Sequence, residues 1–353
     1  MISKLKFSEE HIRDFINLLK DENLLSPNMK DEKFVKWKFC ENPNGNSNYF
    51  IYHDKNEIFG RIMSCPYPGK VFISGKENNS YCLSDLYLKK KFRNPITNLI
   101  NLYKFCIKNS EGIIFHSSNK NSELFYKKIL RNKIFFSLLS VGTPLSFRPF
   151  KIKSFLVIFL LKNFLKFYFK LIRILNFFIC KFNFNFLITE SDKLEFEKDL
   201  NNIQEQLKKT NNFFLRDKNF FEWRYKVYNF KKILRIYKDG KLIGYITLIE
   251  AYVMNLKNLI ILDFQFTKNL GLIGEFILKF KIIQIGLKFN FDTIYSLGNK
   301  NNQIFKQVIG FPFFKIPDNF LPHSNPMFIH NYQEKDKSSL ETINFTISDF
   351  DYF

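Results

Sequence analysis

Apolar and polar positions along the first part of the chain predict a helix, several strands, a helix, a strand and a helix. Residues 8–24 carry apolar positions at helical spacing, and Ser8 followed by two acidic residues suits the start of that helix. Strand-like runs separated by Asn, Gly and Pro follow at 49–53, 58–65, 70–74 and 81–88. Helical spacing returns at 99–107 and 122–129, on either side of a short strand at 113–116. This order fits a mixed sheet flanked by helices.

The second part of the chain repeats this order. We expect strands at 234–238, 242–253, 259–267 and 293–297, and helices at 271–287 and from 302 onward. The two tryptophans of the chain, Trp37 in FVKWKF and Trp223 in FFEWRY, lie 186 residues apart. Asp85 and Asp263, each in an apolar strand-like run before an asparagine-rich turn, lie 178 residues apart. A repeat of this length exceeds the ~20–50 residues of a solenoid repeat, so it predicts a duplicated domain.

The length of 353 residues suits two domains of ~100–200 residues each. We expect an N-terminal domain at 1–150, a linker at 151–190, a C-terminal domain at 191–333 and an acidic tail at 334–353. The tail is predicted to be either a final strand or a solvated end that folds against the basic body.

The linker region 151–188 combines basic and apolar positions without an acidic residue. Its apolar run at 154–161 is shorter than the ~20 residues needed to cross a bilayer. Helical spacing places its basic residues on one face, namely Lys162, Lys166, Lys170 and Arg173. Such a helix either packs onto the two domains and joins them, or makes peripheral contact with a membrane that carries anionic lipid.

The formal net charge of +21 favours attraction to phosphate-bearing partners. The same charge, with the abundance of Lys, Asn, Ile and Phe, is also typical of drift toward AT-rich codons. The five cysteines form no C-x-x-C pair and the five histidines are isolated, which indicates reduced thiols and no metal site. Acidic residues near the N-terminus interrupt any signal-peptide core, so we expect a cytoplasmic protein.

Each half resembles a GNAT-superfamily acyl-CoA N-acyltransferase domain, and the whole resembles the tandem two-domain members of that superfamily. The resemblance covers roughly residues 5–145 and 205–330. It rests on SDLYLKKKFR at 84–93, SSNKNSELFYKK at 117–128 and FFEWRYKVYNFKKILRIYKDGKLIGY at 220–245. It implies an α/β fold of two tandem GNAT-like domains, acetyl-CoA or a related acyl-CoA as donor, an amine as acceptor, and no metal.

In this superfamily, a splayed pair of parallel strands exposes main-chain groups to the pantetheine, and the next helix N-terminus offers N–H groups to the pyrophosphate. The family pattern there is R-x-x-G-x-G/A. The first half keeps Arg93 but loses both small positions, and Pro95 removes an N–H donor. The second half keeps a basic residue and two glycines. The implied donor-binding residues are Leu86, Tyr87, Leu88, Arg93, Asn94, Thr97, Asn98 and Asn119 in the first half, and Lys268, Gly271 and Gly274 in the second.

The resemblance also implies catalytic roles. Tyr126 falls where the family places the tyrosine that protonates the leaving thiolate, and its counterpart is Phe305. Asp85 lies where a carboxylate could orient or deprotonate the amine, and Asp263 is its counterpart. Each residue also fits a structural role, as a hydrogen-bonded buried carboxylate or a packed core ring. We expect the first half to bind acyl-CoA and the second to shape the acceptor cleft.

By analogy with the family, the acceptor is an amino sugar on a nucleotide or lipid carrier, as in surface-polysaccharide biosynthesis. One alternative is an aminoacyl-tRNA-dependent ligase of the same superfamily, which the positive charge suits. Another is a non-catalytic, membrane-associated binding module, which the lost glycines suit. The aromatic and basic residues around Trp37 and Trp223 predict either a nucleic-acid platform or buried packing.

Overall fold

The computed structural model describes residues 1–20, 27–55, 57–119, 122–146, 163, 167–171, 174, 186–191, 197–209, 212–228, 230–253, 255–316 and 323–349. The strands are β1 (Ile2–Lys6), β2 (Asn48–His53), β3 (Ile58–Ile73), β4 (Lys76–Leu88), β5 (Ile113–Asn119), β6 (Ile134–Pro144), β7 (Phe186–Ser191), β8 (Phe213–Phe214), β9 (Lys231–Lys238), β10 (Lys241–Val253), β11 (Leu256–Phe266), β12 (Thr293–Asn299), β13 (Phe314–Lys315) and β14 (His323–His330).

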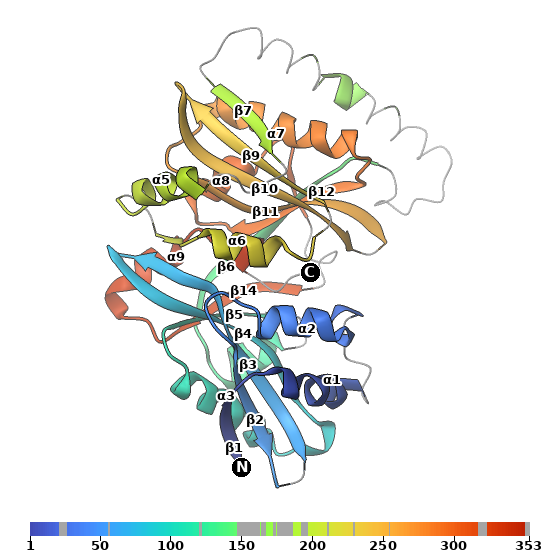
Figure 1. Ribbon diagram of the computed structural model, residues 1–353, viewed down its shortest axis with the longest axis vertical. Coiled ribbons are helices and arrows are strands. Elements are labelled where there is room, and N and C mark those ends of the chain that lie inside the picture. The colour runs from blue at the N-terminus through green and yellow to red at the C-terminus, as the bar shows by residue number, and fades with distance from the viewer. Residues whose placement is uncertain are drawn as a thin grey trace.

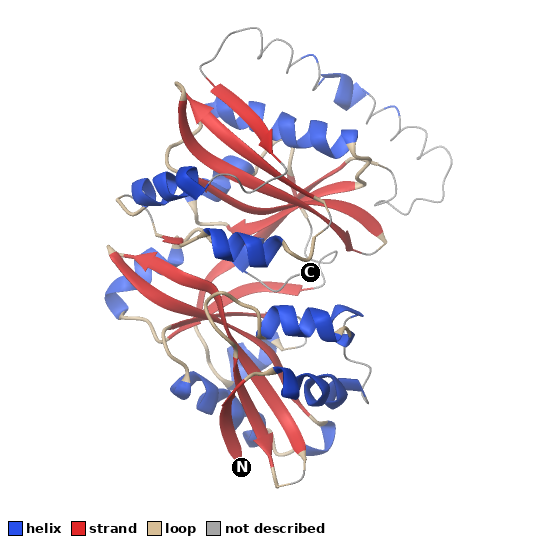
Figure 2. Ribbon diagram, viewed as in Figure 1, coloured by secondary structure: helices blue, strands red, loops and turns tan. Residues whose placement is uncertain are grey.

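The longer helices are α1 (Ile12–Lys20), α2 (Glu32–Phe39), α3 (Thr97–Asn109), α5 (Glu197–Leu207), α6 (Lys218–Tyr225), α7 (Gly271–Lys288), α8 (Gln303–Val308) and α9 (Lys337–Glu341). Shorter turns are η1 (Glu9–His11), η2 (Pro27–Lys30), η3 (Lys90–Phe92), the π-helix η4 (Phe125–Ile129), η7 (Glu334–Asp336) and η8 (Ile347–Asp349). Helices pack on the faces of one continuous mixed sheet (Figures 1 and 2). The predicted α/β class is confirmed.

The order of elements follows the prediction in both halves, with two local differences. The runs expected at 58–65 and 70–74 form a single strand, β3, because a register shift between Cys65 and Gly69 accommodates the prolines. The helix expected at 122–129 contains a π-helical turn at 125–129.

The two halves exchange strands through the sheet, which has the order β1-β2-β3-β4-β5-β14-β6-β12-β11-β10-β9-β7. Strand β6 belongs to the first half in sequence but pairs along β12 of the second half. Strand β14 comes from the end of the second half and pairs with β5 of the first. The linear domain division predicted from the sequence did not anticipate this exchange, in which each half completes the other's sheet.

The two tryptophans meet at the junction of the halves and make reciprocal hydrogen bonds. The indole nitrogen of Trp37 donates to the carbonyl oxygen of Trp223 at 2.8 Å, and that of Trp223 donates to the carbonyl of Trp37 at 2.9 Å. The rings stack with centroids 5.2 Å apart. Their helices, α2 and α6, are capped alike by Asp31 and Asp217, also 186 residues apart. The contact is self-complementary, as at a two-fold dimer interface, so it supports a duplicated domain and buried packing of both tryptophans.

In the described part of the predicted acidic tail, 334–349, the apolar side chains pack into the protein. Leu340, Ile343, Phe345 and Ile347 are fully buried in a hydrophobic cluster that draws residues from both halves. The predicted basic linker lies mostly outside the described residues, although 167–171 are helical. No helix among the described residues is long and apolar enough to cross a membrane.

Candidate active site

In the first half, strands β4 and β5 separate after a short parallel contact. Their pairing covers Ser80–Cys82 against Ile113–Phe115, although β4 continues to Leu88 and β5 to Asn119. A bulge begins just beyond this contact, because Asp85 and Leu86 together face a single residue of β3. Asp85 has a positive φ of 55°, which turns its side chain out of the regular alternation. The structure therefore contains the splayed pair of strands that the resemblance implies.

Asp85 lies on the α2 side of the sheet, with cations close to its carboxylate. The Lys38 ammonium, on α2 and only 2% exposed, donates to Asp85 Oδ2 at 3.1 Å, and the Ser84 hydroxyl donates to the same oxygen at 2.8 Å. Burial alone raises the pKa of Asp85, but Lys38 and then Arg61 outweigh it and hold the pKa below its usual value. Asp85 is therefore ionised at neutral pH.

Arg61, on β3, is a fully buried cation beside Asp85. Its guanidinium stacks on the Phe15 ring and donates to the Phe15 carbonyl. Burial lowers the pKa of Arg61 to about 10, against the opposing effects of Asp85 and Tyr49. The Tyr49 hydroxyl interacts with the Arg61 guanidinium, and burial raises the pKa of Tyr49 to about 12.

Tyr126 lies on the opposite, α3 side of the sheet, so the structure places it in a different cluster from Asp85. Its ring packs against three other rings, with centroid-to-centroid distances of 4.8 Å to His116 of β5, 5.6 Å to Tyr103 of α3 and 5.6 Å to Phe328 of β14. Burial raises the pKa of the Tyr126 hydroxyl well above its usual value. None of the side chains that the structure describes hydrogen-bonds to this hydroxyl.

A polar cluster of two histidines and a tyrosine lies next to Tyr126. The Nε2 atoms of His116 and His330 are 3.1 Å apart, and the Tyr103 hydroxyl lies 2.9 and 2.8 Å from them. The histidine rings are nearly coplanar, at 4°, with centroids 5.3 Å apart, so the two nitrogens point at one another. This is the geometry of an N–H···N hydrogen bond between neutral rings. Burial lowers the pKa of His330 to about 4 and that of His116 well below 6.5.

The helix that follows β4 starts with a partly satisfied first turn. The amides of Asn98, Leu99 and Ile100 donate to the carbonyls of Pro95 and Ile96. Exposed positions around this turn are the predicted donor-binding residues Arg93, Asn94 and Thr97. Arg93 Nε donates to the Leu88 carbonyl at 2.7 Å, which fixes the guanidinium beside the end of β4. Asn98 donates from its side chain to the Phe92 carbonyl at 3.0 Å.

Other predicted donor residues line the end of the splayed strands. Tyr87 and Leu88 are buried, and they pair with Arg61 and Gly60 of β3. Asn119 ends β5 and pairs in register with His323 of β14.

Asp263, the second-half counterpart of Asp85, is 1% exposed and fully engaged. Its Oδ2 accepts from Arg216 Nε and the Tyr245 hydroxyl, both at 3.0 Å, and its Oδ1 accepts from Thr346 at 3.0 Å. Arg216 also pairs with the buried Asp349. These contacts favour the structural role for Asp263, because both carboxylate oxygens are engaged within the protein and the side chain is buried.

Gly271 and Gly274 of the second half are each required for a different structural reason. Gly271 starts α7 with a φ of +70°, a conformation that suits glycine, and its amide donates to Asn269 Oδ1 at 2.7 Å. At Gly274 a Cβ would lie 2.8 Å from the Phe186 ring, so this glycine lets β7 pack on α7. Lys268 is exposed just before that helix. Phe305, the counterpart of Tyr126, is fully buried and packs on Gly298.

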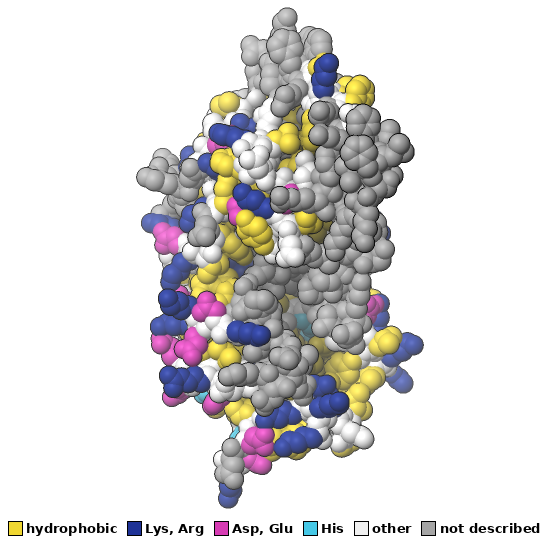
Figure 3. Space-filling model, turned by 90° about the vertical axis from the view of Figure 1, so that its right-hand side faces the viewer, with side chains coloured by type: hydrophobic (Ala, Val, Ile, Leu, Met, Phe, Trp, Pro, Cys, Tyr) yellow, Lys and Arg dark blue, Asp and Glu magenta, His cyan; other side chains and the backbone are white. Residues whose placement is uncertain are grey.

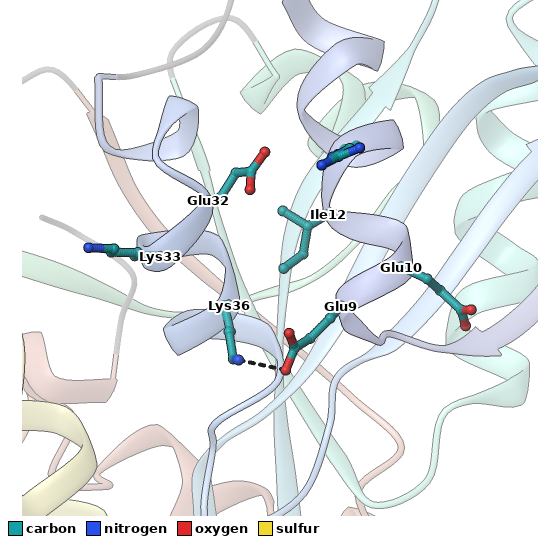
Figure 4. Close-up of a pocket in the computed structure, with 7 residues that line it drawn as sticks. Glu9, Glu10, Ile12, Glu32, Lys33 and Lys36 are labelled. Atoms are coloured by element: carbon teal, nitrogen blue, oxygen red, sulfur yellow. Dashed lines mark ion pairs between the residues drawn. The ribbon is translucent and has the colours of Figure 1, made fainter.

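A solvent-open pocket of about 440 Å³ lies between α1 and α2 (Figure 4). Its lining is highly charged, with Glu9, Glu10, Ile12, Arg13, Glu32, Lys33 and Lys36, and Lys36 pairs with Glu9 at 2.6 Å. Lys38 follows Lys36 by two residues and so points from the opposite side of α2, toward Asp85. The helix therefore separates this pocket from the carboxylate, and we do not assign it to the reaction.

Sequence reasoning missed the partners of the predicted residues. Lys38 carried a signal, because a basic residue follows the tryptophan in both copies of the repeat. Arg61, His116, His330 and Arg216 are isolated in sequence, and only the tertiary fold brings them to partners that are distant in the chain.

No family model matches the sequence, and no curated protein matches it. Solved structures match its fold. A GCN5-related N-acetyltransferase from Anabaena variabilis aligns with a TM-score of 0.57 at 12% identity, over 93% of this chain and 72% of that chain. Saccharomyces cerevisiae N-myristoyltransferase with bound myristoyl-CoA aligns with a TM-score of 0.51 at 11% identity, over 95% of this chain and 84% of that chain. The chain therefore has a two-domain fold of the GNAT kind.

Proposed function

We propose that this protein transfers an acyl group from acyl-CoA to an amine, and that the donor binds in the first half. The observation that carries the proposal is the splay of β4 from β5 at the Asp85 bulge, with α3 beginning beyond the end of β4. The splay leaves strand edges for the pantetheine amides, and the exposed Arg93 beside α3 suits a pyrophosphate. The structural neighbours, which are named as acyltransferases, support the same reaction class.

In the reaction, the amine nitrogen attacks the thioester carbonyl carbon, the carbon–sulfur bond breaks, and the sulfur leaves with the electron pair. The incoming ammonium first loses one proton to solvent to give the attacking amine, the nitrogen loses a second proton after attack, and the thiolate takes up one proton from solvent, so the products are an amide, CoA and one released proton. Asp85 is a poor base because its pKa is lowered, and it serves to orient the incoming ammonium. We place the thioester in the gap between β4 and β5, where it is reached by Asp85 from one side of the sheet and by Tyr126 from the other. Tyr126 has a raised pKa, so it stabilises the departing thiolate by donating a hydrogen bond rather than by full proton transfer.

For the acceptor, we propose an amino sugar on a nucleotide or lipid carrier as the first class to screen. The net charge of +21 suits a phosphate-bearing carrier. On the face shown in Figure 3, acidic side chains lie among the Lys and Arg side chains over both halves. This interspersed arrangement offers less support for a long tRNA contact, which needs a continuous basic surface.

The test of the proposed function combines acetyl-CoA binding with product formation. A thermal-shift titration with acetyl-CoA should raise the melting temperature of the wild type by mass action. With an accepted amine, Tyr126→Phe should lower kcat about 10- to 100-fold while binding of acetyl-CoA is kept. Tyr252→Phe, at a tyrosine that is 70% exposed and remote from the splay, is the matched control.

Two results would count against the proposal. The absence of any acetyl-CoA shift, together with salt-dependent binding of tRNA, supports the tRNA-dependent alternative instead. An unchanged kcat in Tyr126→Phe removes Tyr126 from the reaction even if acetyl-CoA binds.

A further inference from the structure

The second half has a splay like that of the first, and the chain's own C-terminal segment lies in it. Parallel pairing of β11 with β12 ends at Ile261 and Ser296. Beyond that point, β12 bonds to the tail: Gly298 forms a bridge with Thr346, and the Asn299 amide donates to the Phe345 carbonyl at 3.2 Å. Since the other edge of β12 pairs with β6, these contacts lie on the side that faces β11.

The other wall of this splay, β11, bonds to the same segment. The Asn344 side chain donates to the Phe264 carbonyl at 2.8 Å, and the Thr346 hydroxyl donates to Asp263 Oδ1 at 3.0 Å. Residues 344–346 thus contact both strands where they separate. In the first half, β4 beyond Cys82 and β5 beyond Phe115 no longer pair with each other, and the Arg93 side chain donates to the Leu88 carbonyl at the end of β4.

The asparagine-rich turn after β12 anchors the approach to the splay. The Asn299 side chain donates to the carbonyls of Glu341 and Ile343, both at 3.0 Å, and the Asn302 side chain donates to the Thr342 carbonyl at 2.7 Å. Three consecutive carbonyls of the tail are therefore bonded to one turn of the second half.

The segment also seals the splay from solvent. Asn344 and Thr346 are 3% and 1% exposed, and Phe345 is fully buried against Phe115 and Phe136. A pantetheine arm could enter only by expelling this segment together with its buried side chains.

We propose that residues 344–347 permanently fill the gap between β11 and β12 in the second half. The protein therefore binds one acyl-CoA, between β4 and β5 in the first half. The identity of the ligand as acyl-CoA rests on the proposed function. The contacts of residues 344–347 with β11 and β12 are independent of it. The second half thereby takes a non-donor role, as a wall of the site and a support for the exchanged strand β6.

Hydrogen–deuterium exchange of the full chain, with and without acetyl-CoA, tests the proposal. The amides of 297–299 should be protected without ligand and unchanged by acetyl-CoA, whereas peptides covering 83–88 and 116–119 should gain protection. Isothermal titration calorimetry should give one site per chain. Two sites, or altered exchange at 297–299 or 344–347 on binding, would overturn the inference and leave the proposed function standing.

A variant tests residues 344–347 separately from the ligand. Asn344→Ala removes the bond to Phe264 and should speed exchange at 297–299 by about tenfold without ligand. Asn109→Ala, which removes a side-chain bond to the Phe105 carbonyl at the end of α3, should leave that exchange unchanged. Fast exchange at 297–299 in the wild type contradicts the inference outright. If acetyl-CoA binds nowhere, the proposed function fails. The exchange at 297–299 measured without ligand, in the wild type and in Asn344→Ala, still decides whether residues 344–347 lie between β11 and β12.

Discussion

Two equivalent aspartates show how one position can diverge at the level of single residues. Asp85 is paired with one lysine at a bulge and keeps part of its surface accessible, whereas Asp263 is buried against a guanidinium and two hydroxyls. Burying a carboxylate is costly unless its hydrogen bonds are satisfied, and the second half meets that condition with Arg216. The first half leaves its carboxylate available for a ligand.

Replacing Arg216 should test the structural role of this network. Arg216→Leu leaves Asp263 and Asp349 buried without their cation, so we expect a loss of about 3–5 kcal/mol in the free energy of unfolding, measured by urea denaturation. Lys208→Leu breaks only the exposed pair with Glu205 and should cost less than about 1 kcal/mol. Similar costs for the two variants would show that the buried network adds little.

The histidine pair predicts a loss of stability in mild acid. The unfolded chain binds protons on these histidines near pH 6.5, but the folded chain does so at His330 only near pH 4. Stability therefore falls as the pH drops from about 6.5 to 4, by up to about 3 kcal/mol for His330. His330→Gln should flatten this slope in urea titrations at several pH values.

The pH dependence of stability must be compared between the variant and the wild type, because protonation of Asp349 changes the stability in the opposite direction. Burial raises its pKa to about 6, so its protonation favours the folded state in the same pH range. An equal slope in both proteins would rule out the histidine pair as the source of acid sensitivity.

At the level of elements, the repeat in the sequence predicted most of the helices and strands. Periodicity identified α1, α3, α7 and the central strands, because each buries one face against a local neighbour. Periodicity did not reveal the exchange of β6 and β14, because the apolar pattern of a strand does not specify which distant strand it pairs with. For the same reason it located Tyr126 and Asp85 but not their placement on opposite sides of the sheet.

The reciprocal tryptophans predict energetic coupling between α2 and α6. Trp37→Phe and Trp223→Phe each leave a buried carbonyl without its indole donor, so each should cost about 1–3 kcal/mol. Their effects should be non-additive by about 0.5–1.5 kcal/mol in a double-mutant cycle, because the stacked rings share one interface. Strict additivity would indicate that the two hydrogen bonds form independently.

For the whole molecule, strand exchange predicts that the halves are interdependent. Fragments 1–146 and 186–353, produced as separate chains in one cell, should co-purify as a complex, because β6 and β14 each complete the partner's sheet. A shorter second fragment, 186–316, lacks β14 and should fail to form that complex on size-exclusion chromatography. Recovery of a folded, monomeric 1–146 fragment would contradict this interdependence.

The position of β14 in the chain also affects how the protein matures during synthesis. An N-terminal domain usually folds while the rest of the chain is still on the ribosome. Here the first half cannot close its sheet until residue 330 has emerged, since β14 fills the place between β5 and β6. The edge of β5 that pairs with β14 therefore stays unpaired while about two hundred further residues are translated. We expect this protein to depend on chaperones that shield strand edges of the nascent chain.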